Sequence, residues 1–157
     1  AGHISPEIIT LLFLMSLRPN PDNIGNIFKN CSLKEAEVLE SNISGCDFTG
    51  ADFTGTVFKY GGLEKNEMAD TSLNHTSFVS MRMVDMVFSS TAENCFLENC
   101  SFTRVRFENA TLLNTFFKGN RKLNRISFIN CKADRMTYEF LKQGKADLTG
   151  ISLIVQP

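Results

Sequence analysis

The sequence predicts an all-β fold in which short strands wind into a stack of four-sided coils. A large apolar residue recurs at every fifth position through most of the 157 residues. This period fits neither the 3.6 residues of an α-helix nor the two residues of a strand. A small residue recurs two positions before each large one, so two side chains of every five-residue unit point inward. Four such units close a square turn, and stacked turns pair their edges as strands.

The five-residue register begins at Phe28 and continues to Phe88 without a slip. The frame moves by one residue across Ser89–Asn94, resumes at Leu97 and moves back near Arg121. Ten of the 14 phenylalanines fall at the large position, and all five cysteines fall at the small position. These fifteen side chains are the predicted core: Phe28, Phe48, Phe53, Phe58, Phe78, Phe88, Phe102, Phe107, Phe117, Phe128, Cys31, Cys46, Cys95, Cys100 and Cys131.

The repeated units resemble the pentapeptide-repeat family. The stretches ISGCDFTGADFTGTVF, SLNHTSF and KADLTGISL follow the pattern A(D/N)Lxx of that family. The resemblance extends over residues 26–153 and implies a right-handed quadrilateral parallel β-helix. Members of the family are functionally diverse, so the repeat predicts a fold and leaves the function to particular surfaces.

The N-terminal residues 1–23 depart from the repeat and predict a capping helix followed by a linker. Ser5-Pro6-Glu7 is a typical helix start, and the residues up to Leu17 are mostly apolar. Pro19-Asn20-Pro21-Asp22 ends the helix. A helix lying across the first coil would shield the apolar end of the stack. A helix that inserts into a partner or a membrane is the alternative interpretation.

The remaining residues divide into three predicted parts. Residues 24–133 form the β-helix, with a bulge or irregular corner at Ser89–Glu93 where the frame moves. Residues 134–145 form a short helical insertion, and residues 146–157 form the last repeats and the C-terminal end.

The sequence holds no constellation of residues for catalysis. The cysteines face inward by their register and include no tight Cys-x-x-Cys pair, and His3 and His75 are the two histidines. No nucleophile can be paired with a base, and no phosphate-binding or dinucleotide glycine motif occurs. We therefore predict no catalytic, metal-binding or cofactor-binding residue, no cofactor, and no enzyme activity. A catalytic domain would have to lie outside this sequence.

The charge is nearly balanced, with a formal net value of −1 at pH 7. Residues 24–118 carry 8 basic and 12 acidic side chains, whereas residues 119–157 carry seven basic and three acidic ones. Neither region has the clustered charge of a nucleic-acid binder, so no nucleic-acid partner is predicted. No apolar run reaches the roughly 20 residues of a membrane span. The apolar segment Ile8–Leu17 lacks the flanks of a signal peptide, and the bacterial cytoplasm is the expected location.

Three functions stay open. The first is a non-catalytic protein–protein interaction module, part of a larger bacterial protein. The repeats resemble β-helix domains of type III effectors, including the HECT-like ubiquitin ligase effectors, and this resemblance implies virulence, a host protein partner and secretion into the host cytoplasm. The second function is a DNA mimic that binds gyrase or topoisomerase. The third is a structural spacer.

Departures from the repeat are the places where a partner is expected to bind, because the repeats specify shape. The second frame change and the insertion both carry basic side chains. The predicted partner-binding residues are Arg121, Lys122, Arg125, Arg135, Lys142 and Lys145. The sequence leaves the oligomeric state open.

Overall fold

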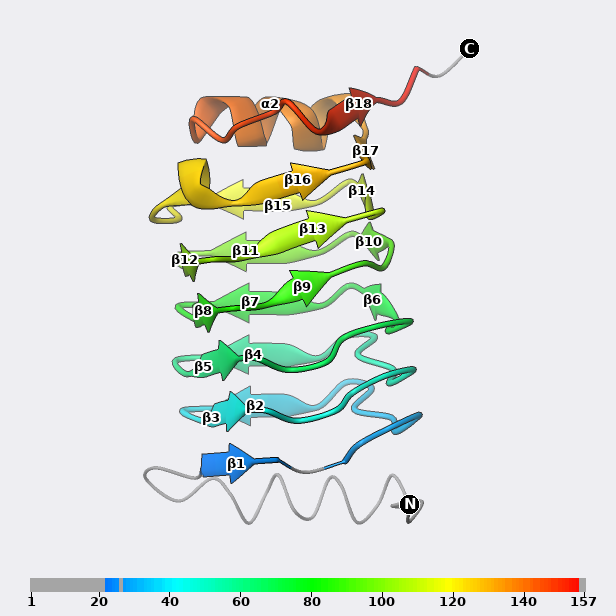
Figure 1. Ribbon diagram of the computed structural model, residues 1–157, viewed down its shortest axis with the longest axis vertical. Coiled ribbons are helices and arrows are strands. Elements are labelled where there is room, and N and C mark those ends of the chain that lie inside the picture. The colour runs from blue at the N-terminus through cyan, green and yellow to red at the C-terminus, as the bar shows by residue number, and fades with distance from the viewer. Residues whose placement is uncertain (1–21, 26, 156–157) are drawn as a thin grey trace.

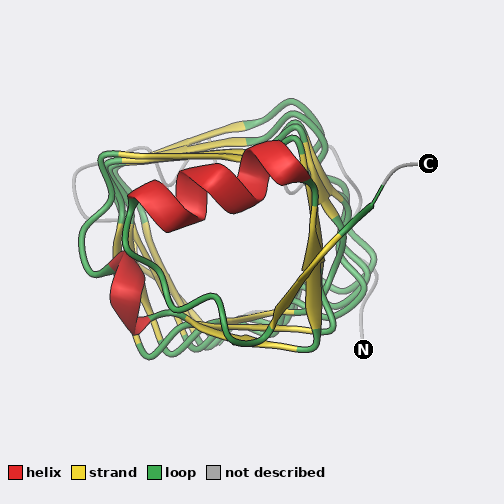
Figure 2. Ribbon diagram, turned by 90° about the horizontal axis from the view of Figure 1, so that it is seen from above, coloured by secondary structure: helices red, strands yellow, loops and turns green. Residues whose placement is uncertain are grey.

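The computed structural model describes residues 22–25 and 27–155. The predicted N-terminal capping helix lies outside these residues. The described chain winds into a stack of four-sided coils, which Figure 1 shows from the side and Figure 2 from above. The predicted quadrilateral parallel β-helix is confirmed, and so is the predicted short helix near the C-terminus.

Each coil contributes one short segment to each of four sides, and segments on one side pair in parallel with those above and below. Side 1 consists of β1 (Asp22–Ile24), β3 (Asn42–Ser44), β5 (Gly62–Glu64), β8 (Arg82–Val84) and β12 (Ser101–Thr103). Side 2 consists of β9 (Val87–Phe88), β13 (Arg106–Glu108) and β16 (Ser127–Ile129). Side 3 consists of β6 (Leu73–Asn74), β10 (Ala92–Glu93), β14 (Thr111–Leu113), β17 (Cys131–Ala133) and β18 (Ile151–Leu153). Side 4 consists of β2 (Glu37–Leu39), β4 (Val57–Lys59), β7 (Ser77–Val79), β11 (Phe96–Glu98) and β15 (Phe116–Lys118).

The unit Asp47-Phe48-Thr49-Gly50 shows how the chain turns a corner. The Phe48 ring points into the core, and a carboxylate oxygen of Asp47 accepts hydrogen bonds from the backbone N–H of Thr49 at 3.0 Å and from its hydroxyl at 2.7 Å. Gly50 then adopts a left-handed φ of +74°. Most units place a left-handed residue two positions after the large one. Glycine and asparagine tolerate this conformation best, which explains the recurring Thr-Gly.

The core consists of columns of side chains that run up the inside of the stack. The ten phenylalanines and five cysteines predicted to face inward are all at most 6% exposed. Rings in successive coils stack on one another, with centroids 5.2 Å apart for Phe58 and Phe78 and 5.4 Å apart for Phe107 and Phe128. Stacked rings of this kind hold neighbouring coils in register as well as excluding water.

Side chains at the small position do more than fill space. Several donate a hydrogen bond to the backbone carbonyl of a large residue 22–24 positions earlier, in the coil below. The Asn66 amide donates to Ile43 O over 2.9 Å, and the Cys100 thiol donates to Phe78 O over 3.2 Å. These bonds tie each coil to the one before it.

The sequence predicts a bulge or irregular corner at the frame change after Phe88, and the structure has a shortened corner there. Ala92 follows Phe88 by four residues and takes the large position on side 3. Ala92 pairs with Leu73, 19 residues earlier, and with Leu112, 20 residues later. The coil therefore loses one residue without changing which side chains face inward. The short side chain of Ala92 leaves a small apolar cavity between neighbouring coils.

A helix closes the C-terminal end of the stack. In the last coil α2 (Arg135–Gln143) takes the place of a strand on side 4, above β15 (Figure 2). Asp134 caps this helix by accepting a hydrogen bond from the backbone N–H of Thr137 at 2.9 Å. Thr137 and Leu141 are fully buried against the coil below. The short 3-10 helix η1 (Leu123–Arg125) lies at the corner between sides 1 and 2 (Figure 2).

Candidate functional site: a basic surface and an aromatic column

The five cysteines are buried and form no disulfide. Burial raises the pKa of the Cys95 and Cys100 thiols to about 11. Burial also raises the thiol pKa of Cys31 and Cys131. A protonated, enclosed thiol is a poor nucleophile and a poor metal ligand. Within the described ranges, no three side chains of His, Cys, Asp or Glu are grouped to hold a metal ion.

The structure gathers five of the six predicted partner-binding residues at one end of side 1. Arg121 continues the strand ladder of side 1 through a bridge to Ser101, Lys122 is the N-cap of η1, and Arg125 is the last residue of η1. The C-terminal end of α2 meets this segment, because Gly144 lies against the side chain of Leu123.

That contact brings Lys142 and Lys145, one on each side of Gly144, to the same end of the stack as the η1 cations. Arg135 lies apart, because it starts the helix and is about 10 Å from Lys142 at 1.5 Å per residue. Arg135 instead lines a groove with Leu153 and Val155 at the end of side 3. The six predicted residues therefore do not form one cluster.

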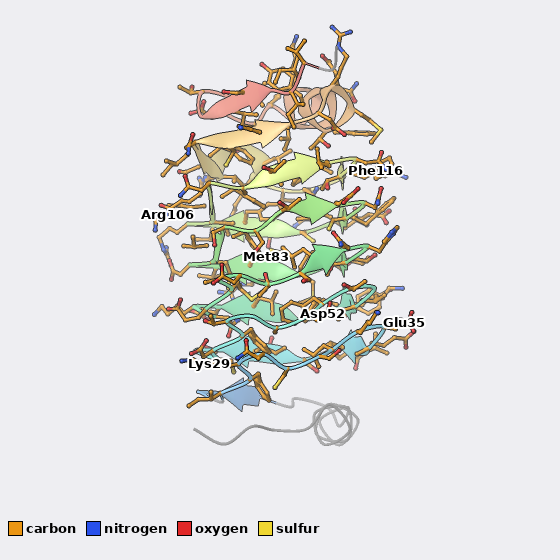
Figure 3. All side chains as sticks on the ribbon, turned by 90° about the vertical axis from the view of Figure 1, so that its right-hand side faces the viewer. Lys29, Glu35, Asp52, Met83, Arg106 and Phe116 are labelled. Atoms are coloured by element: carbon orange, nitrogen blue, oxygen red, sulfur yellow. The ribbon has the colours of Figure 1, made fainter. Side chains whose placement is uncertain are left out.

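Three further arginines, which the sequence analysis missed, extend the basic end of side 1. Arg82 and Arg121 line one shallow groove on side 1. Arg104, Arg106 and Arg125 line a second groove at the corner between sides 1 and 2. We call the whole set the basic surface, which consists of Arg82, Arg104, Arg106, Arg121, Lys122, Arg125, Lys142 and Lys145. Figure 3 shows Arg106 at one edge of the rod, pointing away from it.

Most cations of the basic surface have no anionic partner among the described residues. Arg104 pairs with Asp85 through two hydrogen bonds, of 2.5 Å and 3.1 Å. Arg106 lies 3.5 Å from a carboxylate oxygen of Glu108. The other six cations form no ion pair within the part of the chain that the structure describes. Their charge is available to a partner.

The rod is electrically polarised along its length. Residues 27–70, in the first coils, carry eight acidic and four basic side chains. Residues 71–155 carry eleven basic and seven acidic side chains. The near-zero total charge is therefore the sum of an acidic half and a basic half, and the stacking of the coils places these at opposite ends of the rod.

An aromatic column lies on the outside of side 4. It consists of Phe96, Phe116 and Phe140. The rings of Phe96 and Phe116 stack with centroids 4.9 Å apart, and Phe140 of α2 lies 5.3 Å above Phe116. Phe96 is 37% exposed, and Phe116 points outward at the edge of the rod in Figure 3.

The sequence itself contains a signal for this column. Phe96 and Phe116 stand outside the five-residue register of the core phenylalanines, and they are 20 residues apart, which is one coil. Two out-of-register aromatic residues at that spacing must lie one above the other on the same outer side. Coil spacings of 19 and 20 residues likewise relate Arg82 to Ser101 and Ser101 to Arg121 on side 1.

Part of the chain matches a known family of repeats. Residues 28–59 match the family described as Pentapeptide repeats (8 copies). The structure continues the same five-residue unit through the later coils, which wind into the parallel β-helix that this repeat predicts. A comparison with curated proteins found none that matches.

Several solved structures align with this chain at low TM-scores, and two of the three described next are named as pentapeptide-repeat proteins. A trypsin-treated form of QnrB1, described as a plasmid-mediated fluoroquinolone resistance protein, is 16% identical, with 88% of this chain and 86% of that chain covered and a TM-score of 0.46. Rfr23 from the cyanobacterium Cyanothece is 13% identical, with 82% of this chain and 96% of that chain covered and a TM-score of 0.31. HetL from Nostoc, described as involved in heterocyst differentiation regulation, is 10% identical. The alignment covers 84% of this chain and 82% of that chain, with a TM-score of 0.31. At these values the alignments carry no conclusion about function.

Among the described residues, no helix is both long enough and apolar enough to cross a membrane.

Proposed function

We propose that this protein is a non-catalytic interaction module that binds an acidic surface of a partner protein through its basic surface. The observation that supports this proposal is the convergence of cations from separate coils and from α2 at one end of side 1, most of them without an ion pair. Like charges gathered on a rigid support repel one another, and an anionic partner relieves that repulsion while it gains attraction.

The charge distribution separates this proposal from the two alternatives. A DNA mimic that binds gyrase or topoisomerase requires an acidic rod, whereas the second half of this rod has a surplus of basic side chains. A spacer needs no particular surface, so it gives no reason for unpaired cations to gather on one side. The first half of the rod is acidic and would repel a nucleic acid lying along it, which favours a protein partner.

The proposal extends to the setting in which the module acts. The resemblance of the repeats to the β-helix domains of type III effectors supports a bacterial effector module within a larger protein, delivered into the host cytoplasm to bind a host protein. Parallel capture from a eukaryotic lysate and a bacterial lysate tests this part. A partner found only in the bacterial lysate would overturn it.

A charge-reversal experiment with a matched control tests the binding surface. The test variant is Arg121→Glu, Lys122→Glu and Arg125→Glu, and the control variant is Lys34→Glu, Lys59→Glu and Lys132→Glu on sides 3 and 4. Both variants change the net charge equally. We expect the test variant to lose captured partner proteins that the control variant and the unchanged protein retain. Equal capture by both variants would contradict the proposal.

A further inference from the structure

The phenylalanines of the aromatic column on side 4 are not required by the fold. The equivalent outward positions in the lower coils of side 4 hold Glu37, Val57 and Ser77, which pair in the same strand register as Phe96 and Phe116. A charged, a β-branched and a small polar residue therefore all satisfy the same strand position. Placing two aromatic rings there exposes apolar surface to water, which is unfavourable unless something covers it.

Only part of the column has a structural explanation. Phe140 of α2 packs on Phe116, and this contact helps to hold the helix above β15. Phe96 is one coil lower; its ring contacts Phe116 and remains 37% exposed. Below Phe96 the same column holds Ser77 and then Val57, so the exposed aromatic surface is confined to the upper coils of side 4. Among the described residues, no segment of the chain covers Phe96.

The aromatic column adjoins the basic surface. Lys118 points outward from β15 on the same side as Phe116, two residues further along the strand. The chain then turns through Gly119 and Asn120 and reaches Arg121 of the basic surface. Stacked rings and unpaired cations thus share one corner of the rod, between sides 4 and 1.

We propose that this corner binds a partner segment that carries aromatic or large apolar side chains next to carboxylates. The apolar side chains lie against Phe96 and Phe116, and the carboxylates pair with Lys118 and Arg121. This inference rests on the proposed function and specifies the chemistry of the partner. The charge of the corner favours a partner segment that carries carboxylates. Glu98 is the one acidic side chain on β11 and β15, and the two cations Lys118 and Arg121 outnumber it. In protein–protein interfaces, a few aromatic and arginine residues commonly contribute most of the binding free energy.

Three matched synthetic peptides test the proposal. The first alternates Phe with Asp and Glu, the second replaces each Phe by Ala, and the third replaces each acidic residue by Lys. Binding to the full chain is measured by fluorescence anisotropy and mapped by amide chemical shifts. We expect the first peptide alone to bind, with shifts concentrated on β11, β15 and the turn at Gly119. Binding of all three peptides, of none, or of the first at another place would overturn the proposal.

Two variants and one control locate the binding residues. Phe96→Ser introduces the residue that the same position holds one coil below, and it leaves the Phe116–Phe140 contact in place. We expect it to weaken binding of the first peptide about tenfold. Ile129→Ser, which removes a 47% exposed apolar residue from side 2, should leave binding unchanged. Equal weakening by both variants, or no weakening by Phe96→Ser, would refute the proposed site.

A charge variant keeps the test independent of packing. Lys118→Glu is expected to weaken binding of the acidic peptide, and the double variant Lys118→Glu, Arg121→Glu is expected to abolish it and to allow binding of the Lys-containing peptide. Failure of either change would contradict the role of Lys118. The result for the proposed function can be distinguished from the result for the aromatic column. If charge reversal at Arg121, Lys122 and Arg125 abolishes partner capture but Phe96→Ser does not, the basic surface is supported and the aromatic column is rejected.

Discussion

The hydroxyl group of Thr76 donates a hydrogen bond to the carbonyl oxygen of Phe53, in the coil below, over 2.8 Å. Thr56 and Thr115 stand below and above Thr76 at the same position of side 4, and each donates to a carbonyl in the coil beneath it. Cys95 lies between Thr76 and Thr115, with its thiol directed at the Leu73 carbonyl. These four residues form a line of donors that ties successive coils together.

This line of donors predicts how Cys95 can be replaced. Cys95→Thr keeps a donor in a position where threonine is already used above and below, so we expect the free energy of unfolding to change by less than about 1 kcal/mol. Cys95→Val has nearly the same shape without the donor, and we expect it to lower that free energy by about 1–3 kcal/mol. Urea denaturation of the two variants checks the difference. Equal stabilities would show that the donor contributes nothing.

Asn66 should be among the least replaceable polar residues. It is 5% exposed, its amide donates to Ile43 O, and its side-chain oxygen accepts from the Cys46 backbone N–H over 2.9 Å. Asn66→Leu removes both of these buried hydrogen bonds, so we expect a loss of about 2–4 kcal/mol in the free energy of unfolding. Asn74→Leu, on the exposed surface of side 3, is the control and should change it by less than about 0.5 kcal/mol. A tolerated Asn66→Leu would contradict the assigned bonds.

The cavity beside Ala92 predicts a stabilising substitution. Ala92 occupies a position that Leu73 holds one coil below and Leu112 one coil above. Ala92→Val adds two methyl groups to this apolar space, and we expect it to raise the free energy of unfolding by about 1 kcal/mol. Thermal unfolding followed by circular dichroism measures the change. A lower melting temperature would indicate that the shortened corner leaves no room for the added groups.

Asp134 links the stability of the C-terminal end to pH. Its partial burial raises the carboxyl pKa, but hydrogen bonds from Thr137 and from the Asn114 backbone N–H lower that pKa more. A folded-state pKa below the unfolded value of about 4 stabilises the fold above that pH, and the contribution disappears as the pH falls through the folded-state pKa.

Variants of Asp134 separate the charge from the cap. Asp134→Ala removes both and should cost about 1–2 kcal/mol at neutral pH. Asp134→Asn keeps a cap but cannot titrate, so its stability should depend less on pH below about 4 than that of the unchanged protein. Urea denaturation across the acidic range provides the comparison. An unchanged pH dependence in Asp134→Asn would show that another carboxylate is responsible.

The sequence by itself determined the repeat, the fold class and the inward-facing residues. A five-residue period leaves few ways to bury a large and a small side chain per unit, so Phe58 and Cys100 could be placed in the core from spacing alone. The helix at the C-terminal end was also predictable, because residues 134–145 break the period and carry their own capping residue, Asp134.

Only the tertiary structure decided which surface residues share a side. Arg82, Arg121 and Lys145 are far apart in the sequence, and their grouping depends on coil lengths of 19, 20 and 21 residues and on where α2 ends. A one-residue change in coil length moves every later side chain relative to those below it. The 20-residue spacing of Phe96 and Phe116 already indicates their stacking, whereas the position of Phe140 above Phe116 depends on where α2 packs. Local spacing therefore specifies the inside of this protein, whereas the accumulated register of the whole stack specifies the outside.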